Sequence, residues 1–344
     1  MTATYTRHIL QFKQPGGTSR GVLTTKETWF IIIEHQHRKG IGECGILRGL
    51  SADDRPDYEA KLAWVCKNIH LGADTLCGQL IEFPSILFGL EMAFKSLESN
   101  HPFELFPSQF TQGEKAIPIN GLIWMGTERF MEQQIKSKIE SGFGCIKLKI
   151  GAIDFETELQ LLKSIRKEFS SKDIELRVDA NGAFLPKEAP DKLKRLSEFD
   201  LHSIEQPIKT GQWQEMASLC ETTPLPIALD EELIGVFDRA KQRTLLQTIK
   251  PQYIILKPSF IGGFSGSATW IELAQANGAG WWITSALESN VGLNAIAQWT
   301  YTLGNRMFQG LGTGSLFTNN FSSPLIVKNG TLRYDNSMVW NFNL

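Results

Sequence analysis

The stretch CIKLKIG (Cys145–Gly151) decides the fold of this chain. Aliphatic residues alternate there with Lys147 and Lys149, so one face of the segment is apolar and the other carries two ammonium groups. This alternation indicates a strand whose apolar face is buried and whose charged face borders a polar centre.

Seven other apolar runs resemble this strand in length and composition. They recur at intervals of about 25–30 residues, the length of one strand-plus-helix unit. Together, the eight runs are Ile117–Trp124, Cys145–Ile150, Ile174–Asp179, Leu201–Gln206, Leu225–Asp230, Gln252–Lys257, Trp281–Ser285 and Arg306–Gly312. Eight units over about 200 residues favour a closed βα barrel over an open doubly wound sheet. No GxGxxG follows an early strand to suggest dinucleotide binding.

The first third of the chain predicts an α+β domain. Thr28–His35 has the composition of a strand, and Pro15–Gly21 that of a Gly-rich turn or mobile loop. Tyr58–Ile69 and Pro84–Leu97 have helical periodicity. The expected buried positions of the second helix are Leu87, Leu90, Met92, Ala93 and Leu97. We expect residues 1–115, completed by 315–344, to form one domain and residues 116–314 to form the barrel.

Composition excludes several classes of protein. The formal net charge of -2 argues against a nucleic-acid partner. No apolar run approaches the roughly 20 residues that span a bilayer, and the N-terminus MTATYTRHIL lacks the apolar stretch of a signal peptide. The five cysteines are scattered and form no CxxC pair, which predicts reduced thiols in a cytoplasmic protein. The sequence leaves the oligomeric state open, and an oligomer is possible.

Three acids end consecutive predicted strands: Asp179, Glu205 and Asp230. The carboxyl ends of barrel strands converge on one mouth, so these side chains should meet. Each acid alone could be a turn residue or a helix cap, but three at one repeat spacing predict a site for a hard divalent cation. Mg²⁺ prefers such oxygen ligands and Mn²⁺ could replace it, whereas zinc would call for Cys or His.

Three lysines border the same expected site: Lys147 and Lys149 on one strand and Lys257 at the end of the sixth. A dication and neighbouring ammonium groups would lower the pKa of a lysine, which could then act as a general base. The alternative is a solvated strand end, which the aliphatic residues between the lysines disfavour.

The chain resembles the enolase superfamily, specifically its muconate-lactonizing subgroup. The motifs that carry the resemblance are KLKIG (Lys147–Gly151), RVDANG (Arg177–Gly182), IEQP (Ile204–Pro207), LDEEL (Leu229–Leu233) and ILKPS (Ile255–Ser259). Four further stretches are similar to the o-succinylbenzoate synthase family: RGVLTTKETW (Arg20–Trp29), PINGLIWMG (Pro118–Gly126), SALESNVGLNA (Ser285–Ala295) and GLGTG (Gly310–Gly314). LDEEL departs from the pattern, because Glu232 stands where a Ser is common.

The resemblance implies a modified TIM barrel, (β/α)₇β, with an α+β enolase-type N-terminal capping domain. It implies a small-molecule carboxylate substrate, dehydrated with Mg²⁺ in menaquinone biosynthesis, from 2-succinyl-6-hydroxy-2,4-cyclohexadiene-1-carboxylate to o-succinylbenzoate. Members of this superfamily use a Lys or His base with Mg²⁺, which stabilises an enediolate. Lys149 would be the base, Lys257 would stabilise developing charge, and Lys147 would tune Lys149.

Further roles follow from the same resemblance. Asn181, Glu231 and Arg177 would orient the metal ligands, although a buried ion pair is an equal alternative for Arg177. The expected substrate contacts are Arg20, Asn120, Ser285, Gly312 and Thr313. Pro15–Lys26 would close over the barrel mouth as a lid.

Three other functions remain open. N-acylamino-acid racemases and dipeptide epimerases share the lysines and acids, but epimerases typically carry Asp-x-Asp near the eighth strand, where this chain has GLGTGSLF. Muconate cycloisomerase is a second alternative. An inactive barrel that serves as a scaffold is a third, disfavoured because every expected catalytic position is filled.

Overall fold

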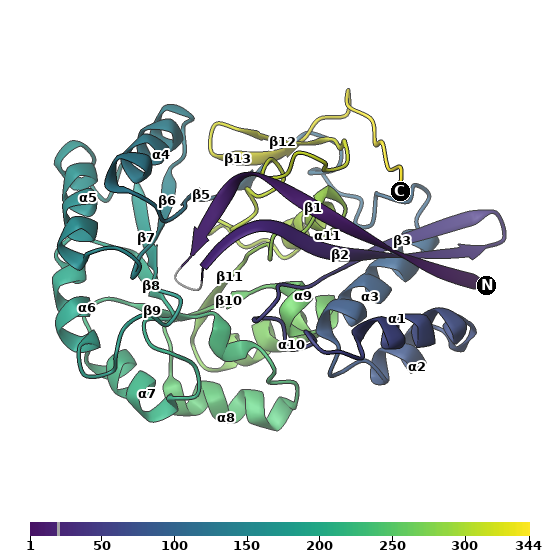
Figure 1. Cartoon of the computed structure of the whole chain (residues 1–344), viewed down its shortest axis with the longest axis horizontal. Helices are drawn as coiled ribbons and strands as arrows, with labels where there is room; N and C mark the ends of the chain where they lie inside the picture. The colour runs from purple at the N-terminus through teal and green to yellow at the C-terminus, as the bar shows by residue number, and fades with distance from the viewer. Residues whose placement is uncertain (19–20) are drawn as a thin grey trace.

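A computed structural model describes residues 1–18 and 21–344 (Figure 1). At its centre lies a parallel sheet with the strand order β11-β10-β9-β8-β7-β6-β5. These strands are β5 (Gly121–Ile123), β6 (Cys145–Lys149), β7 (Glu175–Asp179), β8 (Ser203–Glu205), β9 (Ile227–Leu229), β10 (Tyr253–Leu256) and β11 (Gly280–Ile283). All seven fall within or overlap the predicted apolar runs, so the parallel barrel sheet is confirmed.

Helices cover the outer face of this sheet (Figure 1). They are α4 (Glu128–Glu140), α5 (Phe155–Glu168), α6 (Ala189–Ser197), α7 (Trp213–Thr222), α8 (Arg239–Ile249), α9 (Pro258–Ile261), α10 (Gly263–Ala276) and α11 (Asn290–Thr302), with a 3₁₀ turn η2 at Glu231–Leu233. Side chains cap several of these helices at the N-terminus: Thr127, Asp154 and Asp238 each accept a hydrogen bond from a backbone N–H of the first turn. Outward strand residues such as Leu148 and Val178 are buried against the helices.

The eighth predicted run, Arg306–Gly312, is not a regular strand. It closes the ring through two single parallel bridges, Ile119–Gln309 and Thr284–Gly310. Gln309 N donates to Pro118 O at 2.9 Å, and Gly310 N donates to Ile283 O at 2.8 Å. Gly310 has no room for a side chain, because a Cβ would lie 2.5 Å from Thr284 Oγ1. An irregular segment therefore closes the ring in place of a regular eighth strand.

The first third forms a three-stranded antiparallel sheet packed on helices. Its strands are β1 (Thr2–Thr18), β2 (Gly21–His35) and β3 (Arg38–Gly45), and its helices are α1 (Tyr58–Lys67), α2 (Ala73–Gly78) and α3 (Pro84–Glu98), with a 3₁₀ turn η1 at Ile69–Leu71. The predicted buried residues of α3 are all buried. Strand β3 meets α3 at glycines, since a Cβ on Gly42 would lie 1.8 Å from Gly89 O. The predicted α+β organisation is confirmed.

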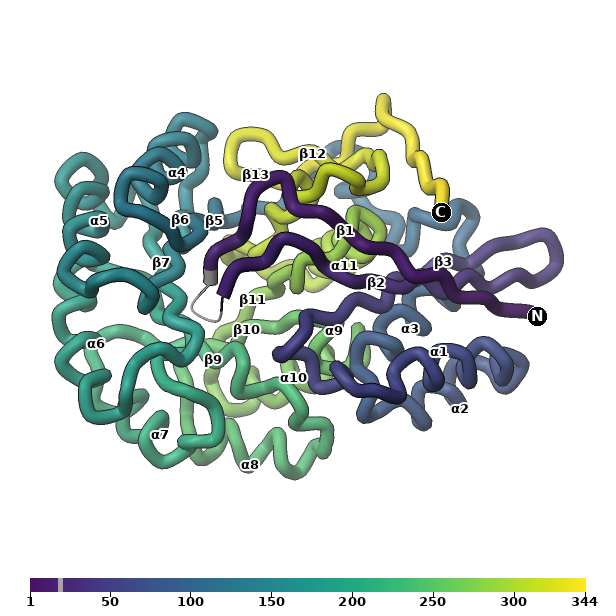
Figure 2. The backbone as a smooth tube through the Cα atoms, in the orientation of Figure 1, coloured from purple at the N-terminus to yellow at the C-terminus, as the bar shows by residue number. Residues whose placement is uncertain are grey.

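The predicted Gly-rich turn at Pro15–Gly21 is largely strand. Pairing of β1 with β2 continues through Gly16 and Gly17 to Thr18, after a register shift between Gln11 and Gly16. The hairpin reaches across to the barrel, where Met125 N donates to Gly17 O at 3.3 Å (Figure 2). Glycine suits this contact, because a Cβ on Gly17 would lie 2.4 Å from Met125 O. The prediction of a turn or mobile loop was wrong for residues 15–18 and 21, because backbone pairing overrides the weak strand preference of glycine. Residues 19 and 20 of the predicted turn lie outside the described part of the chain.

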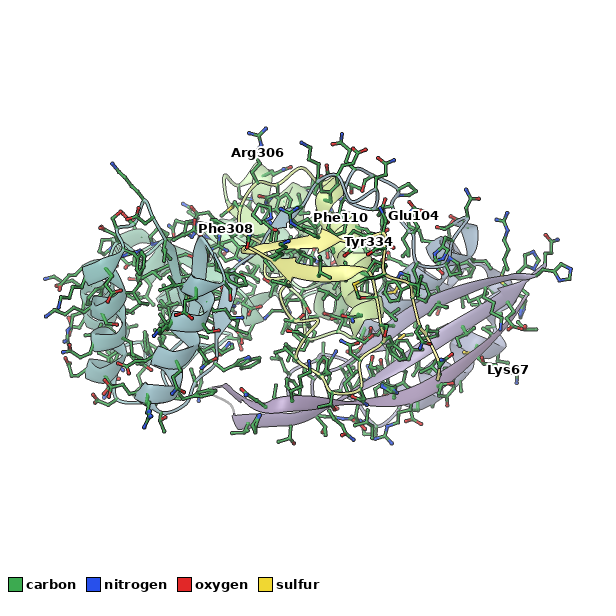
Figure 3. All side chains as sticks on the ribbon, turned by 90° about the horizontal axis from the view of Figure 1, so that it is seen from above. Lys67, Glu104, Phe110, Arg306, Phe308 and Tyr334 are labelled. Atoms are coloured by element: carbon green, nitrogen blue, oxygen red, sulfur yellow. The ribbon has the colours of Figure 1, made fainter. Side chains whose placement is uncertain are left out.

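The C-terminal segment touches both parts of the chain. Strands β12 (Leu325–Lys328) and β13 (Thr331–Tyr334) form a sheet with β4 (Ile117–Pro118), which belongs to the predicted first barrel run. Phe110 packs edge-on against Tyr334 beside this sheet (Figure 3). Nearer the hairpin, Lys13 N donates to Leu316 O and Thr318 N donates to Gln11 O, both at 2.8 Å.

Two sequence predictions about compartment have a structural counterpart. All five cysteines carry free thiols. Among the described residues, we find no helix with the length and apolar character that a membrane crossing requires.

Candidate active site

Three carboxylates meet at the carboxyl ends of β7, β8 and β9. Asp179 is the last residue of β7 and pairs in register with Glu205, the last residue of β8; Asp230 directly follows β9. One oxygen from each lies within 4.8 Å of the other two, and all three residues are buried. The cluster that the sequence predicted is therefore assembled, and it could hold a metal ion.

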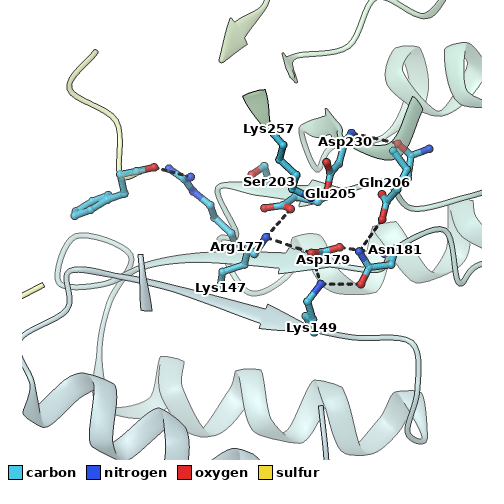
Figure 4. Close-up of polar contacts among 12 residues, drawn as sticks. Lys147, Lys149, Arg177, Asp179, Asn181, Ser203, Glu205, Gln206, Asp230 and Lys257 are labelled. Carbon is cyan, nitrogen blue, oxygen red and sulfur yellow. Dashed lines mark hydrogen bonds and ion pairs between the residues drawn. The ribbon is translucent and has the colours of Figure 1, made fainter. Parts of the chain in front are cut away.

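Two lysines from β6 approach these carboxylates from one side (Figure 4). Lys147 Nζ donates to Glu205 Oε2 at 2.7 Å and to Asp179 Oδ2 at 3.2 Å. Lys149 Nζ donates to the same Asp179 oxygen at 2.9 Å and to Asn181 Oδ1 at 2.8 Å. The alternation of β6 thus places both ammonium groups inside the ring, as predicted.

The third lysine comes from the opposite wall. Lys257 follows β10, and its ammonium group forms an ion pair with Asp230 Oδ2. Figure 4 shows Lys257 and Lys149 on opposite sides of the carboxylate cluster. Ammonium groups therefore approach the carboxylate cluster from two opposite walls of the barrel.

Without a metal ion, the protein charges raise the pKa of two of the lysines, Lys147 and Lys257. Burial by itself lowers the pKa of Lys147, but the carboxylates of Glu205 and Asp179 overcome it and hold that pKa well above its ordinary value. Burial by itself also lowers the pKa of Lys257, but the Asp230 carboxylate overcomes this effect, and the pKa is raised. The sequence prediction of lowered pKa values assumed a bound dication as well as neighbouring ammonium groups, so it stays a prediction for the metal-loaded site.

The three carboxylates of the cluster differ in the direction in which their pKa values are shifted. Burial favours the neutral form of Asp179, but Lys149 and Lys147 outweigh it and hold the pKa of this carboxyl far below its usual range. Burial raises the pKa of Glu205 to about 7 and also raises that of Asp230, because each has fewer close cations. Glu205 Oε1 is buried and has no hydrogen-bond partner among the described residues. A buried, unpaired acceptor of this kind is what a cation would satisfy.

The residues predicted to orient the metal ligands have different contacts. Asn181 N donates to Asp179 Oδ1 at 3.1 Å, and its side-chain amide donates to Glu231 Oε1 at 2.9 Å. Arg177 instead donates to Glu175 at 2.7 Å and to Phe308 O at 3.0 Å. The contacts of Asn181 and Glu231 support the orienting role that was predicted for them. For Arg177 that role stays a prediction.

A cavity of about 700 Å³ opens above the lysines. Four of the five predicted substrate contacts line it: Asn120, Ser285, Gly312 and Thr313. The fifth, Arg20, lies outside the described residues. The hairpin and the segment after β3 supply apolar wall residues, namely Val22, Leu23, Leu47 and Leu50.

Comparisons with known proteins agree with this architecture. The model of the family described as "Enolase C-terminal domain-like" matches residues 130–337. The o-succinylbenzoate synthase of Desulfotalea psychrophila is 50% identical, over 96% of this chain and 98% of the relative. The chain belongs to the o-succinylbenzoate synthase family of the enolase superfamily.

Solved structures place this family member among related folds. The crystal structure of MenC from Desulfotalea psychrophila has a TM-score of 0.86 and 46% identity, covering 97% of this chain and 99% of that one. The L-Ala-D/L-Glu epimerase of Bacillus subtilis has a TM-score of 0.83 at 20% identity, covering 97% and 96%. The predicted (β/α)₇β barrel with an enolase-type capping domain is confirmed.

One residue that the sequence analysis missed is Gln206, in the family motif IEQP. Its side-chain oxygen accepts from the backbone N–H groups of Asp230 and Glu232, both at 3.2 Å. Its amide donates to Glu232 Oε2 at 3.0 Å, and the other oxygen of Glu232 accepts from Trp213 Nε1 at 2.9 Å. Glu232, the departure from the subgroup pattern, is therefore built into this network.

A second missed residue is Glu288, in the family stretch SALESNVGLNA. It is fully buried and accepts from Ser259 and Ser285, both at 2.6 Å, while Thr313 donates to Ser285 at 2.9 Å. One carboxylate thus ties together the ends of three barrel segments beside Lys257. The available signal was an acid three residues after a strand-end serine.

Proposed function

We propose that this chain catalyses the Mg²⁺-dependent syn-dehydration of 2-succinyl-6-hydroxy-2,4-cyclohexadiene-1-carboxylate to o-succinylbenzoate, a step of menaquinone biosynthesis. The observation that carries the proposal is the placement of Lys149 and Lys257 on opposite walls of one cavity, with three carboxylates between them. The full-length similarity to an o-succinylbenzoate synthase supports the choice of substrate. Cytoplasmic location is part of the proposal.

The ligands of Mg²⁺ would be Asp179, Glu205 and Asp230. Their oxygen chemistry suits a hard cation, and the unpaired oxygen Glu205 Oε1 supports the fit. When bound, the ion would hold the ring carboxylate and stabilise negative charge that develops on it. Asn181 would keep the Asp179 carboxylate in orientation through its backbone N–H.

Lys149 would carry the proton. Its Nζ would take the proton from the ring carbon next to the carboxylate, and the C–O bond to the ring hydroxyl would break as the ring becomes aromatic. The same ammonium group would return the proton to the departing hydroxyl, which leaves as water. One residue can serve both transfers because a syn elimination uses a single face of the ring.

Lys257 and the hairpin would support the reaction without transferring a proton. From the opposite wall, the Lys257 ammonium group would stabilise the charge that spreads onto the carboxylate. The hairpin wall of the cavity would reduce the access of water and so strengthen these electrostatic interactions. Lys147, buried between Glu205 and Asp179, would hold both carboxylates in place.

Racemases and epimerases are the main alternative. The Bacillus subtilis L-Ala-D/L-Glu epimerase is 27% identical over 61% of this chain and 55% of its own length, a weaker and shorter match. The segment Gly310–Phe317 contains no acid that could hold a substrate ammonium group. Both features favour the dehydratase.

The deciding experiment is a direct assay. Purified protein is incubated with the cyclohexadiene substrate and Mg²⁺, and formation of the aromatic product is followed by ultraviolet absorbance. N-succinylamino acids and dipeptides are tested in parallel by polarimetry. Racemisation without dehydration would refute the proposal.

A further inference from the structure

We propose that Arg48 binds the second carboxylate of the substrate, the one at the end of its succinyl chain. This inference rests on the proposed function, because that substrate carries one carboxylate on the ring and another on the tail. The ring carboxylate is directed to the metal site, so the tail needs a separate cation within the same cavity.

Arg48 lies at the mouth of the barrel. It belongs to the segment between β3 and α1, of which Leu47, Arg48, Gly49 and Leu50 line the cavity. The same segment reaches the loop that follows Asp230, since a Cβ built on Gly235 would lie 4.0 Å from the Cβ of Ala52. Arg48 is therefore held above the carboxyl ends of the strands, where the lysines lie.

The cations that line the cavity narrow the choice of a partner for the tail carboxylate. Apart from the three lysines of the site, the described residues that line the cavity include two cations, Arg48 and Lys138. The stem of Lys138 lies against Gly121, at the start of β5, and its ammonium group is 5.0 Å from the ring centroid of Phe143. Phe143 precedes β6, so Lys138 lies toward the amino ends of the strands, away from the catalytic end.

The guanidinium of Arg48 is held in a fixed orientation. Its Nε donates to Glu27 Oε2 at 2.5 Å, and Nη1 donates to Asp54 Oδ1 at 2.6 Å. Asp54 is fixed in turn by Gly49 N, at 2.7 Å. Nη2 also contacts Glu27 Oε2, so three of the five N–H donors of the guanidinium meet carboxylates. Two donors remain for a ligand, and the planar fork suits a carboxylate. The Arg48 side chain is 55% exposed, which leaves it open to the cavity.

Arg7 provides a matched control. It also forms an ion pair with Glu27, and its side chain is 49% exposed, close to the value for Arg48. It is not among the residues that line the cavity. A variant of Arg7 therefore disturbs the same Glu27 carboxylate without removing a charge from the cavity wall.

The test measures binding of two products by calorimetry in the presence of Mg²⁺. One ligand is o-succinylbenzoate; the other is its methyl ester at the tail carboxylate, which lacks the tail charge and is larger by one methyl group. We expect Arg48→Gln to weaken binding of o-succinylbenzoate about tenfold or more, the usual effect of losing a hydrogen bond to a charged group. Binding of the ester should change less than twofold, and Arg7→Gln should leave both affinities near those of the wild type.

Two results would overturn the assignment. Equal weakening of both ligands by Arg48→Gln would give Arg48 a structural role, and unchanged affinity for o-succinylbenzoate would remove it from the site. Turnover of the cyclohexadiene substrate by the wild type is measured in the same series. Wild-type turnover combined with either result refutes only the role of Arg48, whereas absence of turnover refutes the proposed function and this inference with it.

Discussion

Lys147 and Lys149 share a single acceptor: both ammonium groups donate to Oδ2 of Asp179, at 3.2 and 2.9 Å. This shared contact couples the two lysines, because any change at Asp179 alters the charge environment of both. It also explains why the pKa of Asp179 is held far below its usual range although the residue is fully buried. Variants of Lys147, Lys149 and Asp179 should therefore have different effects on the site.

Replacement of Lys149 tests the assignment of the base. Lys149→Arg keeps a positive charge but cannot accept a proton, because guanidinium does not deprotonate in proteins. We expect turnover to fall about 10²–10⁴-fold, the usual effect of losing a general base. Exchange of the substrate α-proton with solvent deuterium should fall in parallel.

Lys257→Arg serves as the comparison for Lys149→Arg. It should retain more activity, because the proposed role of Lys257 requires charge and no proton transfer. Proton exchange at the wild-type rate in Lys149→Ala, with loss of exchange in Lys257→Ala, would reverse the two roles.

Removal of one acid should show metal binding without any assay of activity. Added Mg²⁺ should raise the melting temperature of the wild type, since a ligand that binds the folded state stabilises it. Asp179→Asn should abolish most of this shift because it removes one of three carboxylates from the cluster. Asp173→Asn, a change at an exposed acid, should retain it. An equal shift in both variants would place the ion elsewhere.

The docking of the hairpin can be tested at Gly17. Its Cβ in Gly17→Ala would lie 2.4 Å from the carbonyl oxygen of Met125, a backbone atom that cannot turn aside. Overpacking of this kind costs about 1–3 kcal/mol. We expect a rise in KM, because the hairpin forms one wall of the cavity. Gly78→Ala, in α2 with nothing within 4 Å of the added atom, should leave KM unchanged; similar kinetics in both variants would contradict the contact.

Asp53 should give stability a distinctive dependence on pH. Burial raises the pKa of this carboxyl to about 6 against the effect of hydrogen bonds from Ser85, whereas the unfolded value is about 3.9. The folded state therefore binds the proton more tightly, so this contribution is complete below about pH 4 and is lost as pH rises to about 6. The loss amounts to about 3 kcal/mol at most.

Urea denaturation from pH 4 to 7 measures this effect. Asp53→Asn should flatten the decline, because asparagine does not titrate. Asp54→Asn is a control of opposite sign: burial acts to raise the pKa of Asp54, but Gly49 N and Arg48 outweigh it and lower that pKa. Because this lowered pKa lies below the range of the titration, that variant should lose a similar amount of stability at pH 4 and at pH 7 and leave the slope unchanged. Identical slopes in wild type and Asp53→Asn would contradict the prediction.

Much of the fold was predictable because most strands can be recognised from their own local sequence. Strands β6 to β10 each combine aliphatic residues with a charged residue at or just after the carboxyl end, and a parallel barrel brings those ends together. Asp179, Glu205 and Asp230 could therefore be assigned to one cluster from spacing alone. The eighth run has similar composition but forms only two single bridges, and the lack of room for a side chain at Gly310 beside Thr284 is visible only in three-dimensional packing.

The remaining residues were not predictable for a shared reason. Gln206 acts through the backbone of Asp230, 24 residues later, and Glu288 acts through Ser259, 29 residues earlier. Neither of these two contacts has a local signature, because the partner lies in another strand-plus-helix unit. The one local signal for Glu288 is Ser285, three residues earlier. The hairpin was hidden by composition, since Gly16 and Gly17 predict a turn but pair as strand where small residues are needed against Trp124 and Met125.

Backbone contacts between β1 and the segment around Phe317 make one wall of the cavity depend on residues that are far apart in the sequence. Lys13 N donates to Leu316 O, and Thr318 N donates to Gln11 O. Gln309 and Gly310, which complete the ring, lie just before this segment. A chain cut before residue 310 would therefore keep the three lysines and all three acids but have an open ring and an unsupported hairpin. Such a truncation should remove turnover without removing any residue of the carboxylate cluster.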